Sequence, residues 1–163
     1  TAMSRAVVCW TPSGRPEALR KTVLRMPIWR ALAVIIAANA SSLPPRYSAT
    51  ARDMAVLGMA LRARFPQHFH YFSESDFLFR GRLVRGHNDM LGRVRGVNGI
   101  KTGYIRASGF NIVTSYDADG RRLILVVMGA DSARQRNDHV EALIQRNLSP
   151  ASNTTTRLLY AQE

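Results

Sequence analysis

The sequence predicts an α+β fold in which helices flank an antiparallel β-sheet, as one domain or part of one. Residues 111–116 and 122–128 have the composition of strands, and the intervening Asp-Ala-Asp-Gly predicts a tight turn. The second of these strands belongs to the continuous apolar run LILVVMGA, which is typical of a strand buried on both faces. Helical apolar spacing precedes and follows this pair of strands.

Changes in composition divide the 163 residues into three segments. Residues 1–38 contain three prolines, and their apolar positions follow neither a helical nor a strand period, so we expect this segment to pack loosely or not at all. Residues 39–148 carry the regular patterns. Residues 149–163 form a polar tail. We therefore expect the ordered part to lie within residues 39–148.

The first predicted helix begins at Thr50 and ends before Pro66. Thr50 and Asp53 have the spacing of a capping box. Its predicted apolar stripe consists of Met54, Leu57, Gly58, Leu61 and Phe65.

The closing helix is predicted over residues 131–146, with Ser132 or Asp131 as its cap. Its predicted inner side consists of Val140, Leu143 and Ile144.

A second hairpin is predicted between the first helix and the main strands, with residues 76–79 and 82–85 as its strands. Three histidines lie near it in the sequence: His68, His70 and His87. They have neither a regular ligand spacing nor a carboxylate partner. We therefore interpret them as solvated or core-edge side chains and expect no metal site.

The stretch GVNGIKTGYIRASGFNIVTS, residues 96–115, contains the candidate binding residues Lys101, Thr102 and Gly103. They are expected near the start of an extended segment, after a turn that contains Gly99. The lysine supplies a point positive charge, the threonine a hydroxyl donor, and the glycine leaves room for a ligand's backbone. Together they suit a carboxylate-bearing peptide lying along the strand.

The net charge of +12 is concentrated in two patches. Residues 1–38 carry six cations against Glu17, and residues 80–106 carry seven against Asp89. Such patches suggest nucleic acid, but no helix-turn-helix, zinc-ligand set or aromatic RNA-binding strand accompanies them. We expect a solvated basic rim and no nucleic-acid partner. A basic binder of anionic polymers that uses residues 80–106 remains an alternative.

The longest wholly apolar run, Ala31–Ala38, is too short to span a bilayer, so no transmembrane helix is expected. It resembles part of a secretory signal, with Arg25 and Arg30 before it and an Ala-x-Ala ending. That interpretation requires a start at Met26 and leaves the preceding residues unexplained, so we assign no signal peptide.

Five segments carry a resemblance to a known family: NASSLP, YSATARDMAVLGMAL, FPQHFHYF, HNDMLGRVRGVNGIKTGYIRASGFNIVTS and RRLILVVMGADS. In this order and spacing, the chain resembles serine-type D-alanyl-D-alanine carboxypeptidases over residues 39–147. These are low-molecular-mass penicillin-binding proteins, related to the serine β-lactamases. The resemblance implies the C-terminal part of the catalytic domain, hence a partial β-lactamase/transpeptidase-like fold that lacks the N-terminal strands and the nucleophile helix.

The resemblance also implies a function and a place for it. Family members remove the terminal D-alanine from peptidoglycan stem peptides outside the cytoplasmic membrane, through an acyl-serine intermediate and without a cofactor. Penicillins mimic the substrate and trap that intermediate. The family's lysine-threonine-glycine strand binds the substrate carboxylate, a role that the resemblance gives to Lys101, Thr102 and Gly103.

Two motifs that the family needs are absent from this sequence. Its Ser-x-x-Lys motif supplies the nucleophile and its base, but Ala18 and Asn98 stand three residues before the chain's two lysines. No asparagine has a serine two positions before it, so Ser-x-Asn is missing too. We expect an inactive, truncated enzyme, and an upstream frameshift or miscalled start, with the family frame resuming near Asn39, would explain both absences. A non-catalytic module that binds carboxylates or peptides is the alternative.

Overall fold

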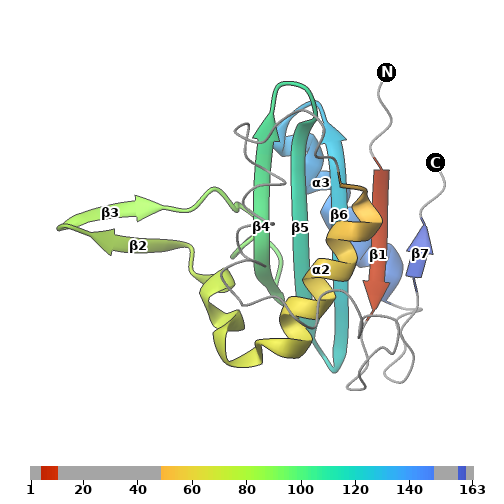
Figure 1. Ribbon diagram of the computed structural model, residues 1–163, viewed down its shortest axis with the longest axis horizontal. Helices are drawn as coiled ribbons and strands as arrows, with labels where there is room; N and C mark the ends of the chain where they lie inside the picture. Colours follow the sequence, from red (N-terminus) through yellow and green to blue (C-terminus); the bar gives the residue numbers. More distant parts are fainter. Residues whose placement is uncertain (1–4, 11–48, 149–157, 161–163) are drawn as a thin grey trace.

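A computed structural model describes residues 5–10, 49–148 and 158–160. Its elements are β1 (Arg5–Trp10), α2 (Ala51–Arg64), a 3-10 helix (Pro66–Ser73), β2 (Asp76–Phe79), β3 (Arg82–Arg85), β4 (Val97–Ile105), β5 (Gly109–Ala118), β6 (Arg121–Ala130), α3 (Ala133–Leu148) and β7 (Leu158–Tyr160). Figure 1 shows α2 in front of the main sheet, α3 behind it, and the β2–β3 hairpin extending to one side. The predicted α+β architecture is confirmed.

The main sheet has five strands in the order β4-β5-β6-β1-β7, and all neighbouring strands are antiparallel. Its centre is the predicted β5–β6 hairpin. Asp119 and Gly120 at the turn have φ angles of 54° and 71°, the left-handed conformation that a two-residue hairpin turn requires. Both strands are longer than predicted, because their pairing extends from Phe110↔Ala130 to Ala118↔Arg121.

The apolar run of β6 contributes to the core on both faces of the sheet, as predicted. Leu123 to Val127 are all buried. Ile124 and Val126 pack in the cluster that includes α2, whereas Leu123, Leu125 and Val127 pack in the cluster that includes α3. Successive side chains of a strand point to opposite faces, so one apolar run supports both helices.

Helix α2 has the predicted capping box. The Thr50 hydroxyl accepts a hydrogen bond from the Asp53 backbone at 3.2 Å, and the Asp53 carboxylate accepts one from the Thr50 backbone at 2.9 Å. The helix ends before Pro66. Met54, Gly58 and Leu61 of the predicted stripe are buried, whereas Leu57 and Phe65 are partly buried against the same cluster.

Two strands were not predicted, and both lie outside the segment that was expected to contain the ordered part. β1 belongs to the segment expected to pack loosely, yet it pairs with β6 from Arg5↔Met128 to Trp10↔Leu123. β7 belongs to the expected polar tail and pairs with β1. The reason is that the edge of β6 presents backbone donors and acceptors that need partners, and β1 supplies them. The rest of residues 1–38, with the signal-like run, lies outside the described residues.

The β2–β3 hairpin is confirmed, with register pairs from Asp76↔Arg85 to Phe79↔Arg82. All eight strand residues are exposed. No helix among the described residues is long and apolar enough to cross a membrane.

Candidate functional site: a cationic cleft beside β4

Strand β4 carries the three candidate residues at the edge of the main sheet. Lys101, Thr102 and Gly103 pair with Val113, Ile112 and Asn111 of β5. They lie in the middle of the strand rather than near its start, because β4 begins at Val97 and includes Gly99 as an irregularity in the register.

Gly99 has no room for a side chain. Its φ angle is +144°, and a Cβ atom built on it would lie 2.7 Å from the Cβ of Phe72 in the 3-10 helix. The close approach of this helix to the strand therefore requires glycine two residues before Lys101.

A cleft of about 500 Å³ opens beside these residues. Its walls come from β4, from the start of β5, from the segment that follows β3 and from the first turn of α3. They consist of Gly86, His87, Asp89, Lys101, Thr102, Gly103, Tyr104, Phe110, Ala133 and Arg136. None of these described lining residues is a serine or a cysteine, the two side chains most often used as acylated nucleophiles. The Thr102 hydroxyl lies against the carbonyl of His87.

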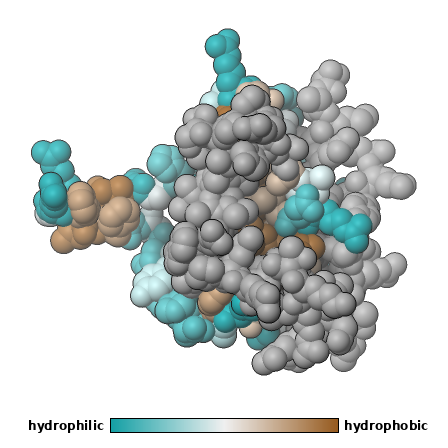
Figure 2. All heavy atoms as spheres, viewed as in Figure 1, coloured by the Kyte–Doolittle hydropathy of each residue, from teal (hydrophilic) through white to brown (hydrophobic). Residues whose placement is uncertain are grey.

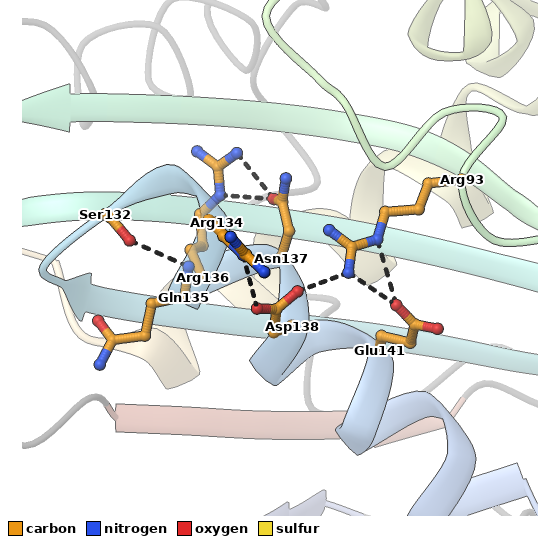
Figure 3. A network of polar contacts seen from close by, with 8 residues as sticks. All are labelled: Arg93, Ser132, Arg134, Gln135, Arg136, Asn137, Asp138 and Glu141. Atoms are coloured by element: carbon orange, nitrogen blue, oxygen red, sulfur yellow. Dashed lines mark hydrogen bonds and ion pairs between the residues drawn. The ribbon is translucent and has the colours of Figure 1, made fainter.

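The structure adds Arg136, which the sequence analysis missed. Its Nε and Nη2 atoms donate to the side-chain oxygen of Asn137 at 3.0 and 2.8 Å (Figure 3). Arg136 is only 3% exposed. Among the described residues, no carboxylate lies within ion-pair distance of it. No direct ion pair within the described residues neutralises this buried guanidinium, so its charge is available to an anionic ligand.

Burial and neighbouring charge act on both cations of the cleft. Burial lowers the pKa of the Lys101 ammonium, and the positive charge of Arg136 lowers it further. Burial also lowers the pKa of Arg136, whereas the charge of Asp89 opposes that shift. An anion bound between the two cations would relieve their repulsion.

Lys101 and Thr102 are held by backbone oxygens. The Nζ atom of Lys101 donates to the carbonyl of Thr102 at 2.5 Å. The Thr102 hydroxyl points to the carbonyl of His87 at 3.4 Å, a long contact. Thr102 is buried and Lys101 is half-buried, so both side chains line the cleft with restricted freedom.

The first turn of α3 places Arg136 in the cleft. The Ser132 hydroxyl accepts a hydrogen bond from the backbone of Gln135 at 3.1 Å, which identifies Ser132 rather than Asp131 as the cap (Figure 3). Arg93, in the segment before β4, donates to Asp138 at 2.5 Å and to Glu141 at 3.0 Å. These contacts connect α3, which carries Arg136, to the chain segment that leads into β4, which carries Lys101.

Asn111, in the sequence Ser-Gly-Phe-Asn, supports the strand next to the site. Its Oδ1 atom accepts from the backbone of Gly129 at 3.0 Å, and its Nδ2 atom donates to Ser108 at 2.9 Å and to the carbonyl of Gly109 at 3.0 Å. The β5–β6 register shifts between Phe110 and Ile112, so Asn111 occupies the irregularity. It holds β5 in place behind Gly103.

The serines that flank the binding strand have other partners. Ser108 accepts from Asn111, and the fully buried Ser115 accepts from Arg62 at 2.7 Å. Arg62 also pairs with Asp117. Neither serine lines the cleft.

The fold is that of the penicillin-binding proteins, as two solved structures show. Penicillin-binding protein 5 from Haemophilus influenzae matches with a TM-score of 0.62 and 31% identity, over 65% of this chain and 31% of that chain. Penicillin-binding protein D2 from Listeria monocytogenes, in its cefotaxime-bound form, matches with a TM-score of 0.61 and 26% identity, over 67% of this chain and 46% of that chain.

The sequence comparisons define the family. The profile of the D-alanyl-D-alanine carboxypeptidases matches residues 38–132. D-alanyl-D-alanine carboxypeptidase DacD of Escherichia coli is 36% identical over 120 residues, which are 71% of this chain. The chain belongs to the D-alanyl-D-alanine carboxypeptidase family, as the sequence predicts, and spans 30% of the length of DacD.

Proposed function

We propose that the cleft binds the terminal carboxylate of a D-alanyl-D-alanine peptide between Lys101, Thr102 and Arg136, with the peptide passing over Gly103. The observation that supports this most directly is the pair of cations, Lys101 and Arg136, that line one cleft without an ion-pair partner among the described residues. An arginine can bind a carboxylate with two parallel hydrogen bonds, and a lysine adds a point charge.

The edge position of β4 suits an extended peptide. Within the described part of the chain, β4 pairs with β5 on one side only. Its other edge presents backbone donors and acceptors that a peptide strand can use, while Gly103 lets the ligand's backbone approach.

The reaction follows from the family. The whole enzyme is a hydrolase that removes the terminal D-alanine from peptidoglycan stem peptides outside the cytoplasmic membrane, through an acyl-serine. The residues of this chain contribute binding and orientation, because its sequence contains no Ser-x-x-Lys. β-Lactams also carry a carboxylate, so the same cations bind them. The Listeria relative with cefotaxime bound supports this assignment.

A non-catalytic carboxylate-binding module is the second candidate. It is favoured by one observation: the binding residues are present in a chain that lacks both nucleophile motifs. It shares the ligand with the first candidate and differs from it in forming no acyl intermediate. A binder of anionic polymers differs from both, because its affinity would fall steeply with salt.

The test is an NMR titration of the chain with N-acetyl-D-alanyl-D-alanine and with its carboxamide, which lacks only the charge. We expect the acid to shift resonances of β4 and of the first turn of α3, and the carboxamide to shift them little. Arg136→Gln and Lys101→Gln should each abolish the response to the acid. Arg146→Gln, an exposed arginine in the last turn of the same helix, is the matched control and should leave it unchanged. Equal shifts with acid and carboxamide would contradict the proposal.

A further inference from the structure

Among the described residues, the β2–β3 hairpin carries most of the large exposed apolar side chains. Five of its side chains are large, apolar and exposed: Phe77 (57%), Leu78 (72%), Phe79 (56%), Leu83 (61%) and Val84 (39%). Neither strand packs extensively on any other described element. Figure 1 shows the hairpin extending away from the sheet, and Figure 2 shows its brown apolar surface beside a teal tip. A concentration of exposed apolar surface of this kind indicates an interaction site.

The apolar side chains lie on both faces of the hairpin. Phe77 and Val84 are directly opposite each other on one face, and Leu78 and Leu83 are opposite each other on the other face. A hairpin that packs on a protein surface usually has one apolar and one polar face. Apolar side chains on both faces instead suit a hairpin that is surrounded by an apolar environment.

The charges of the hairpin are mainly positive. Arg80, Arg82 and Arg85 stand against Asp76 alone. Arg80 and Arg82 lie at the tip, and the guanidinium of Arg80 lies 5.3 Å from the centre of the Phe79 ring. Long arginine side chains can extend from an apolar surface to phosphate groups while their stems remain in contact with it. The same three arginines would repel those of a second copy, which argues against self-association through the hairpin.

We propose that the β2–β3 hairpin inserts shallowly into an anionic phospholipid surface. Its aromatic and aliphatic side chains would enter the boundary between headgroups and acyl chains, and its arginines would contact lipid phosphates.

This membrane contact would also position the cleft. Gly86 donates its backbone N–H to the carbonyl of Ser75 at 2.7 Å, which closes the base of the hairpin. Gly86 also lines the cleft. A Cβ atom at this position would lie 2.9 Å from the same carbonyl oxygen, so the closure is tight. Insertion of the hairpin would therefore hold the cleft close to the membrane surface.

The test is co-sedimentation of the full chain with vesicles of phosphatidylglycerol and phosphatidylcholine, compared with vesicles of phosphatidylcholine alone. We expect binding to the anionic vesicles only. The double variant F77S/F79S should bind at least about tenfold more weakly, because two aromatic side chains that enter the lipid are lost. The variant R80Q/R82Q should bind more weakly at low salt. Tyr71→Ser, which removes an exposed aromatic residue (65%) outside the hairpin, is the matched control and should bind like the unaltered chain.

Circular dichroism and size-exclusion chromatography of each variant exclude loss of folding as the cause. Anionic vesicles that bind F77S/F79S as tightly as the unaltered chain would overturn the proposal, since binding would then rest on charge elsewhere. No binding to anionic vesicles would also overturn it. Self-association that F77S/F79S abolishes, without vesicle binding, would identify a second copy as the occupant instead.

Discussion

Arg136 shows at the scale of a single residue how burial creates a binding group. It lies on the face of α3 that also carries the buried residues Val140, Leu143 and Ile144. A charge on that buried face is costly unless it is paired. Its only described side-chain partner is the neutral amide of Asn137, so the cost is offset when a carboxylate enters the cleft.

Lys101 should make carboxylate binding sensitive to alkaline pH. Its pKa lies below the ordinary 10.5, mainly because of burial. A bound carboxylate favours the charged ammonium, so affinity for N-acetyl-D-alanyl-D-alanine should fall as pH rises through this lowered pKa. Dissociation constants measured from neutral to alkaline pH should begin to rise at a lower pH than that at which an ordinary lysine titrates. Lys101→Arg keeps its charge over this range and should give a flat profile. A flat profile in the unaltered chain would contradict the assignment.

Asn111 should be a stabilising residue rather than a ligand-binding one. Asn111→Ala leaves the backbone N–H of Gly129 without its acceptor and removes two further hydrogen bonds. The free energy of unfolding should fall by about 1–3 kcal/mol, measured by urea denaturation. Ser108→Ala removes only one of these bonds and should cost less. An Asn111→Ala variant as stable as the unaltered chain would show that the irregularity in β5 does not need this side chain.

At the scale of elements, the cap of α2 can be tested by itself. Thr50→Ala removes the hydroxyl that accepts from Asp53 and donates to its carboxylate at 2.7 Å. The expected loss is about 1 kcal/mol, while Thr50→Ser should retain most of the stability. The Thr50 hydroxyl is the main cause that lowers the pKa of Asp53 below 3.8. A carboxylate with a lowered pKa stabilises the fold above its ordinary pKa, and this contribution is lost as pH falls through the lowered value.

The difference between Thr50→Ala and the unaltered chain should therefore shrink below about pH 3.8. Thermal unfolding at neutral and acidic pH measures it. A difference that stays constant or grows on acidification would mean that the hydroxyl stabilises the helix without the charge of Asp53.

At the scale of the whole molecule, we expect the chain to form no covalent adduct with a fluorescent penicillin. Acylation needs a serine activated by a nearby base. The sequence has no Ser-x-x-Lys, Ser108 and Ser115 are hydrogen-bonded to other side chains, and no serine is among the described residues that line the cleft. Mass measurement after denaturation is the test, and a stoichiometric adduct on any serine would refute the prediction. The penicillin should still compete with the D-alanyl-D-alanine peptide for the cleft without reacting.

The sequence by itself determined the features that depend on local interactions. The cap at Thr50 and the turn at Asp119–Gly120 are specified by residues close together in the chain, so their patterns predict them directly. The run LILVVMGA determined a strand buried on both faces. The motif around Lys101 identified the family, because its spacing is continuous in the sequence.

Only the tertiary structure decided which residues from distant segments meet. β1 and β7 have little recognisable pattern, and their place depends on the edge that β6 offers. The sequence signal for Arg136 was a charged residue on the otherwise apolar face of α3. The sequence does not show that this residue lines the same cleft as Lys101. The β2–β3 hairpin was predicted, whereas its exposure was not, because burial depends on the surfaces that the rest of the chain brings near it.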